Sequence, residues 1–205
     1  MKILATRVIA NAAPGLRMGM GAPVGYPALG LITTDCDDAT YIALDAATKA
    51  ADVRVCYARS LYAGAGNATT PNAGEVIGVL AGANPETLKS GMEAALSTLQ
   101  RVGFEEVNGV PFLAHTVSSV GSFLAEEAGV RVGTAIAYLI APPLEAIYGL
   151  DGAMKAADVK LCKLYSPPSE TNFGGGLLSG TQSACDAACK AFAERVREVA
   201  ERSKV

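Results

Sequence analysis

The chain has 205 residues, of which 50% are hydrophobic and 18% charged, and its formal net charge is −3 at pH 7. This composition is typical of a well-packed globular protein and excludes a disordered chain, and the acidic balance disfavours a nucleic-acid partner. No stretch approaches the ~20 apolar residues of a membrane span and the N-terminus lacks the apolar run of an export signal, so we expect a cytoplasmic protein with no membrane partner.

The first half of the chain predicts four strands and two helices. Residues 3–11 form a short run rich in β-branched side chains, which predicts a strand. Residues 12–27 contain too much Gly and Pro for a helix and are interpreted as a loop. The remaining predicted elements are a strand at 28–35, a helix from about Thr40, a strand at 51–62, a long loop at 63–74, a strand at 74–82 and a helix at 86–101. Asn84 is the predicted N-cap of that last helix, with Pro85 at its first position.

The second half repeats a stretch of the first. LDAATKAADVRVC at Leu44 to Cys56 returns as LDGAMKAADVKLC at Leu150 to Cys162, with nine of the thirteen residues identical at a constant offset of 106. A chain that repeats itself at half its length is expected to contain two copies of one fold. The elements predicted around this second copy are a strand at 111–119, a helix at 122–129, a strand at 134–143, the repeated helix and strand, a loop at 166–176, a short strand and a C-terminal amphipathic helix.

This order predicts two domains, at 1–106 and 107–205. Each has strands that alternate with helices, and we expect an α+β fold in which helices cover one face of an antiparallel sheet. Two domains of this size also fit the length of the chain.

An acidic cluster marks the end of the strand predicted at 28–35. It contains Asp35, Asp37 and Asp38, and Glu75 begins a strand after the long loop. Neighbouring carboxylates repel one another and stay ionised mainly when they are solvated or matched by a cation. The alternative is that Asp37 or Asp38 caps the helix. We predict no metal site, because His and Cys are missing at ligand spacing.

The remaining polar and reactive residues do not form a catalytic constellation. Gly174 to Gly176 lacks the spacing and the Lys of a phosphate-binding loop, and is interpreted as loop backbone that changes conformation or admits a neighbouring chain. Cys185 and Cys189 are expected on a buried helix face, and Cys56 and Cys162 at equivalent core positions where two strands end. An odd number of cysteines favours reduced thiols. His115 has no triad partners, so we expect no catalytic residue and no cofactor.

Long stretches of the chain resemble a known family. They are ALGLITTDCDDATYIALDAATKAADV, YARSLYAGAGNATTPNAGEVIGVLAG, AYLIAPPLEAIYGLDGAMKAADV and PPSETNFGGGLLSGTQSACDAACKAF. These stretches are similar to the EutL-type tandem-domain shell proteins of ethanolamine-utilisation bacterial microcompartments, over about residues 28–200. The resemblance implies two tandem circularly permuted shell domains, and a homotrimer whose six domains form a pseudo-hexagonal tile that packs with other microcompartment shell proteins. Residues 16–27 and 101–112 depart from the family pattern.

The resemblance also implies two kinds of pore. Small acidic pores would bind an amine substrate such as ethanolamine, and the matching residues are Asp37, Asp38 and Glu75. A gated central pore would be formed by the two long loops, with the candidate residues Tyr62, Ala63, Gly64, Ala65, Gly66, Ser169, Glu170, Thr171, Asn172 and Phe173. The alternative function is a small-molecule-binding enzyme or sensor of α+β fold, in which the acidic residues act as base and ligand clamp. A trimer that forms flat sheets without turnover distinguishes the shell protein from this alternative.

Overall fold

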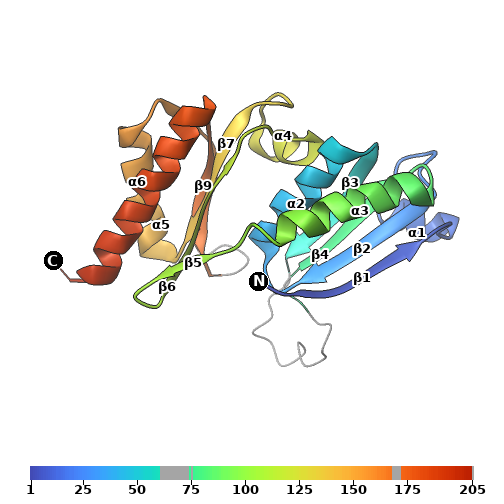
Figure 1. Ribbon diagram of the computed structural model, residues 1–205, viewed down its shortest axis with the longest axis horizontal. Helices are drawn as coiled ribbons and strands as arrows, with labels where there is room; N and C mark the ends of the chain where they lie inside the picture. Colours follow the sequence, from blue (N-terminus) through green and yellow to red (C-terminus); the bar gives the residue numbers. More distant parts are fainter. Residues whose placement is uncertain (61–73, 75, 168–171, 205) are drawn as a thin grey trace. The chain divides into compact units, whose positions relative to one another are not determined.

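A computed structural model describes residues 1–60, 74, 76–167 and 172–204 of the chain (Figure 1). The chain forms two compact units, of which the first contains Met1–Gly103 with Gly121–Leu124 and the second contains Phe104–Val120 with Ala125–Val205. Within the described residues, no helix is both long enough and apolar enough to cross a membrane.

The first unit contains a four-stranded antiparallel sheet with the strand order β1-β2-β4-β3. Its elements are β1 (Ile3–Ile9), α1 (Pro14–Gly19), β2 (Ala28–Thr34), α2 (Asp37–Ala50), β3 (Val53–Ser60), β4 (Val76–Gly82) and α3 (Pro85–Leu99). The predicted cap of α3 is confirmed, because the Asn84 side chain accepts a hydrogen bond from the Thr87 N–H at 2.8 Å.

Helices α2 and α3 pack together on one face of this sheet (Figure 1). Glycines in the strands let them approach closely. A Cβ added to Gly30 in β2 would lie 2.5 Å from Met92 Sδ of α3, and one added to Gly78 in β4 would lie 2.7 Å from Leu44 Cδ1 of α2. Residues 30 and 78 face the same side, because Gly30 pairs with Leu80 and side chains alternate along a strand.

The opposite face of the first sheet is covered by residues 12–26. Ala12, Met20, Ala22 and Tyr26 pack with Leu29, Val79 and Ala81 in a small apolar cluster. The prediction of a loop without a helix is wrong here, because Pro14–Gly19 form the short helix α1. Pro14 stands in the first turn, where its missing N–H costs no hydrogen bond.

The second unit contains a five-stranded antiparallel sheet with the strand order β5-β6-β7-β9-β8. Its elements are β5 (Glu105–Val107), β6 (Val110–Val117), β7 (Ala135–Ala141), α5 (Pro143–Ala156), β8 (Val159–Tyr165), β9 (Gly174–Gly180) and α6 (Gln182–Glu201). The short helix α4 (Ser122–Ala128) begins in the first unit and ends in the second. Helices α5 and α6 pack together (Figure 1), and an apolar core that includes Leu139, Leu150 and Phe192 lies between them and the sheet.

Two differences from the predicted elements concern the second unit. Strand β5 was missed, although Asn108 (φ 50°) and Gly109 (φ 80°) make the two-residue turn that joins it to β6 and is a known hairpin signal. The run Gly174 to Gly176 is not loop backbone but the buried start of β9, and a Cβ on Gly175 would lie 1.9 Å from the Leu139 carbonyl oxygen. Glycine is required there by close packing of strands rather than by motion.

The paired cysteines of the repeat lie at equivalent irregularities of the two sheets. The register of β3 against β4 shifts between Val55 and Tyr57, and that of β8 against β9 shifts between Leu161 and Lys163. Cys56 and Cys162 are the extra residues of these bulges, and both are half-buried. Their predicted equivalence is confirmed, whereas their predicted place at the strand ends is wrong. Cys185 and Cys189 are buried in the second core, as expected.

Candidate functional site

The acidic cluster lies where β2 ends and α2 begins. The Thr34 hydroxyl accepts a hydrogen bond from the Cys36 N–H at 3.0 Å, and the Thr40 hydroxyl donates to the Cys36 carbonyl oxygen at 2.8 Å. The two buried hydroxyls lie 2.8 Å apart. This network makes Cys36 the N-cap and starts α2 at Asp37, three residues earlier than predicted.

Asp37 and Asp38 occupy the first turn of α2 and are only 8% and 7% exposed. Asp37 Oδ1 accepts a hydrogen bond from the Asp38 N–H at 2.9 Å, and Asp37 Oδ2 accepts one from the Ser60 hydroxyl of β3 at 2.7 Å. The prediction that one of them is the N-cap is wrong, because that position belongs to Cys36. Two carboxylates in the first turn are nevertheless stabilised by the positive end of the helix dipole.

Asp35 and Cys36 complete this region with different roles. Asp35 is exposed, and its Oδ1 accepts a hydrogen bond from the Lys2 backbone N–H at 2.5 Å, so this carboxylate holds the N-terminus. Burial, with the negative charges of Asp38 and Asp37, raises the pKa of the Cys36 thiol to about 12. The thiol is therefore neutral and unreactive.

The other predicted pore residues are divided between described and undescribed parts of the chain. Nine of the predicted pore residues lie outside the part of the chain that the structure describes: Glu75, Tyr62, Ala63, Gly64, Ala65, Gly66, Ser169, Glu170 and Thr171. Asn172 is exposed in a left-handed conformation (φ 64°), and the Phe173 ring packs edge-on against the Phe104 ring with 5.6 Å between centroids. Phe173 therefore anchors the base of the second long loop to the second unit.

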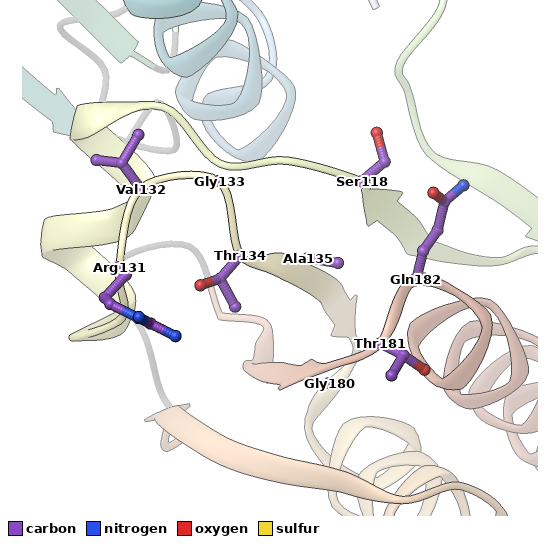
Figure 2. Close-up of a pocket in the computed structure, with 9 residues that line it drawn as sticks. All are labelled: Ser118, Arg131, Val132, Gly133, Thr134, Ala135, Gly180, Thr181 and Gln182. Atoms are coloured by element: carbon purple, nitrogen blue, oxygen red, sulfur yellow. The ribbon is translucent and has the colours of Figure 1, made fainter.

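An open depression of about 510 Å³ in the second unit has no counterpart in the sequence prediction (Figure 2). Figure 2 shows Arg131, Val132 and Gly133 on the loop between α4 and β7, and Thr181 and Gln182 at the start of α6. The Thr181 hydroxyl already caps α6 by accepting a hydrogen bond from the Ala184 N–H at 3.2 Å. The depression is thus an open surface feature whose lining side chains are mostly polar, with Arg131 as the one charged residue among them.

The described residues hold no cluster of the kind that binds a metal ion. No group of three or more His, Cys, Asp or Glu side chains comes together among them. His115 lies on β6 opposite Tyr138 of β7. Asp37 and Asp38 thus place two carboxylates in one helical turn, next to which a cation is electrostatically favoured.

Comparison with known proteins gives consistent matches. A family model described as "BMC domain" matches residues 28–112. The bacterial microcompartment shell protein EutL of Clostridium perfringens is 54% identical over 202 residues, which cover 97% of this chain and 93% of that protein. The crystal structure of EutL from Clostridium perfringens superposes with a TM-score of 0.94 at 53% identity, over 98% of this chain and 94% of the other. The ethanolamine utilization protein EutL of Leptotrichia buccalis superposes with a TM-score of 0.95 at 50% identity, over 99% and 95%. High identity over nearly the full length, with the same fold, means that the chain belongs to the EutL family of bacterial microcompartment shell proteins.

Proposed function

We propose that the protein forms homotrimers whose two-domain chains build a pseudo-hexagonal shell tile, and that Asp37 and Asp38 attract an amine cation such as ethanolamine to a small pore of this tile. The observation that carries the proposal is the pair of carboxylates in one helical turn, each less than a tenth exposed. Membership of the EutL family makes the chain a structural component of a microcompartment shell rather than an enzyme. The enzyme or sensor alternative is therefore disfavoured.

The physical basis is the cost of two neighbouring negative charges with little water around them. The Ser60 hydroxyl and the Asp38 N–H stabilise Asp37 by direct hydrogen bonds, and they also fix its direction. A cation beside the pair relieves the remaining repulsion, whereas an anion adds to it. A pore mouth with this charge would concentrate small cations by focusing the field.

Binding of ethanolamine tests the acidic site. We expect isothermal titration calorimetry to detect ethanolamine binding to the unsubstituted protein but not binding of ethylene glycol, which lacks the charge. Asp37→Asn and Asp38→Asn should each weaken ethanolamine binding about tenfold, since each removes one charge of the pair. Asp52→Asn is the matched control, because Asp52 is an exposed carboxylate of the same unit that accepts a hydrogen bond from Tyr26. Equal affinity in all variants would contradict the acidic site.

The gated central pore is a further part of the proposal. Its candidate segments are residues 61–74 and 167–173, since residues 174–176 belong to β9; Ser60 of β3 precedes the first segment and Phe173 ends the second. Ser60 donates to Asp37, so the first loop starts next to the acidic pair. A bistable loop pair biased by ligand would let larger molecules pass. Conductance across a reconstituted shell layer would test this, and a conductance that never switches between two levels would contradict the gate.

A further inference from the structure

The depression of about 510 Å³ in the second unit lies at the end of the sheet away from the second long loop. Gly180, which ends β9, pairs there with Ala135 at the start of β7, whereas β9 begins after that loop. Figure 2 shows two of the polar lining residues, Arg131 and Thr134, on one side of Ala135, and three others on its far side: Ser118, Thr181 and Gln182. The volume is that of a small-molecule site, for which about 300–1,000 Å³ is usual.

The turn at the rim of the depression is repeated in the first unit. The Thr134 N–H donates a hydrogen bond to the Arg131 carbonyl oxygen at 3.1 Å, and the Tyr26 N–H donates one to that of Pro23 at 3.1 Å. The third residue of each turn is a glycine with a positive φ, of 90° and 89°, as a type II turn requires. Each turn leads into the strand that follows it, so Arg131 corresponds to Pro23.

The polar side chains of the depression are not repeated with this backbone. Ser118 follows β6 and Thr181 follows β9, and the residues that follow the equivalent strands β1 and β4 are Ala10 and Ala83. The second copy therefore has a guanidinium and two hydroxyls where the first copy has a proline and two alanines. Since the same backbone forms without these groups, the fold does not require them, and a ligand is the remaining use for them.

The chemistry of the lining favours a phosphate group. Arg131 is exposed and, within the described residues, forms no ion pair with an acidic side chain. A guanidinium donates two parallel hydrogen bonds to a phosphate, and the hydroxyls of Ser118 and Thr134 and the amide of Gln182 are further donors. The whole chain has a net charge of −3, so its overall charge would not collect anions and any binding must be local.

We propose that this depression binds a small phosphate monoester, with Arg131 paired to the phosphate and with Ser118, Thr134 and Gln182 as hydrogen-bond donors. The rest of the volume holds the organic part of the ligand, because a phosphate ion alone would leave most of it to water. The site takes the opposite charge from the one proposed at the aspartate pair of α2, and it depends neither on that pair nor on the homotrimer. Because the depression is open to solvent, binding is weak and exchange is fast.

Isothermal titration calorimetry at constant ionic strength tests the site, with glycerol 2-phosphate, inorganic phosphate and acetate as probes. We expect saturable binding of glycerol 2-phosphate, weaker binding of inorganic phosphate, and no competition by acetate, which has one charge and two oxygens. Absence of saturable binding of either phosphate, or equal competition by acetate, would overturn the proposal. Inorganic phosphate that binds as tightly as the ester would overturn the assignment of an organic ligand.

Removal of the lining charge identifies the residue that binds. Arg131→Gln should weaken binding of glycerol 2-phosphate at least about tenfold, because a charge-assisted bidentate pair is lost. Arg197→Gln is the matched control, since Arg197 is an exposed arginine of α6 in the same unit that does not line the depression. Equal weakening by the two substitutions would mean that the ligand responds only to net charge, and would overturn the site.

A second variant places a negative charge in the depression without harm to the fold. Gln182 is exposed in the first turn of α6, where a carboxylate is favoured by the helix dipole. Gln182→Glu should therefore keep the circular dichroism spectrum and abolish measurable binding of glycerol 2-phosphate. Ser90→Glu, which adds the same charge at an exposed position of α3, should leave binding unchanged. Retained binding in a folded Gln182→Glu variant would overturn the proposal.

Discussion

Helices α2 and α5 end in the two copies of the repeated stretch, yet the repeated residues have different surroundings. Both carry an Asp–Lys pair on one face, Asp45–Lys49 on α2 and Asp151–Lys155 on α5, and pack against a neighbouring helix, α3 and α6 respectively. On α2 the Asp is fully buried and binds backbone N–H groups, whereas on α5 it faces solvent among apolar side chains. The repeat therefore specifies the fold of each unit, while residues outside it decide what each helix face contacts.

The leading ends of the two helices differ in the same way. Asp37 and Asp38 begin α2, and Pro143 and Leu144 stand at the corresponding positions of α5. The aspartate pair that we propose for the small pore is thus present in the first copy only, whereas the first turn of α5 has the single acid Glu145. A duplicated chain can give its two halves different functions where a ring of identical domains cannot. Four predictions follow this difference between the copies, from the largest effect to the smallest.

Removal of the buried carboxylate of α2 should cost the most. Asp45→Ala leaves the N–H groups of Gly121 and Leu124 without their acceptor, and we expect the free energy of unfolding to fall by about 4 kcal/mol. Asp45→Asn keeps one acceptor oxygen and should cost about half as much. Urea denaturation followed by circular dichroism measures both, with Glu93→Ala as a surface control expected within about 0.5 kcal/mol of the unsubstituted protein. A loss below about 1 kcal/mol for Asp45→Ala would show that these contacts are not needed.

The equivalent strands β4 and β9 differ at one position, where β4 has a side chain and β9 has no room for one. Gly82 ends β4 and pairs with Ala28, and Gly180 ends β9 and pairs with Ala135, so these two glycines are equivalent. Ile77 and Gly175 lie five residues before them and are therefore equivalent too. Gly175→Ala would place a Cβ 1.9 Å from the Leu139 carbonyl oxygen and should destabilise the protein by about 3 kcal/mol. Gly19→Ala is the control, because nothing lies within 4 Å of its added Cβ. If Gly175→Ala unfolds at the same denaturant concentration as Gly19→Ala, the packing of β9 is not as described.

The helix packing differs at a third equivalent position. Ala43 on α2 corresponds to Gly149 on α5, where an added Cβ would lie 2.7 Å from two ring atoms of Phe192. We expect Gly149→Ala to lower the free energy of unfolding by about 1 kcal/mol, and hence the melting temperature. The cost of overpacking against Phe192 exceeds the gain in helix propensity from alanine. Phe192→Leu should abolish this additional cost in a double-mutant cycle. Additive effects of the two substitutions would contradict the contact.

The smallest effect concerns pH and the Cys36 thiol, which has no counterpart in the second copy. Burial raises the pKa of Cys36 from 9.0 to about 12, so above pH 9 the unfolded chain loses this proton before the folded chain does. The thiol's contribution to stability is therefore fully present below pH 9 and is lost as the pH rises, by about 1 kcal/mol for each pH unit at first. Cys36→Ala should show a correspondingly shallower decline in stability between pH 9 and 10. Parallel pH profiles of the two proteins would contradict the burial of the thiol.

Much of the fold is predictable from the sequence because its signals are local. The β-branched runs, Asn84 before Pro85, and the repeat give the order of the main strands and helices. Strand β5 was also within reach, since Asn108 and Gly109 form a hairpin turn. The start of β9 was not, because three glycines have no strand propensity. They are required by close neighbours: the β7 backbone at Gly175, the Lys163 carbonyl oxygen of β8 at Gly176, and Pro167 at Gly174.

The candidate site is less predictable than the fold. Its acidic residues are visible in the sequence, but the cap by Cys36 depends on buried hydrogen bonds of Thr34 and Thr40 that link a strand end to a helix. The role of Asp45 depends on its hydrogen bonds with Gly121 and Leu124, which are distant from it in the sequence. The sequence signal that points to Asp45 is the Asp–Lys pair, which is kept in both copies of the repeat.

The state of association tests the account most directly. Light scattering over a wide range of concentrations, followed by negative-stain electron microscopy of the concentrated protein, measures both the size of the particle and its packing. A three-chain particle that packs edge to edge into a flat hexagonal layer is the result that the account predicts. A discrete monomer or dimer at every concentration, with no layer, would contradict it.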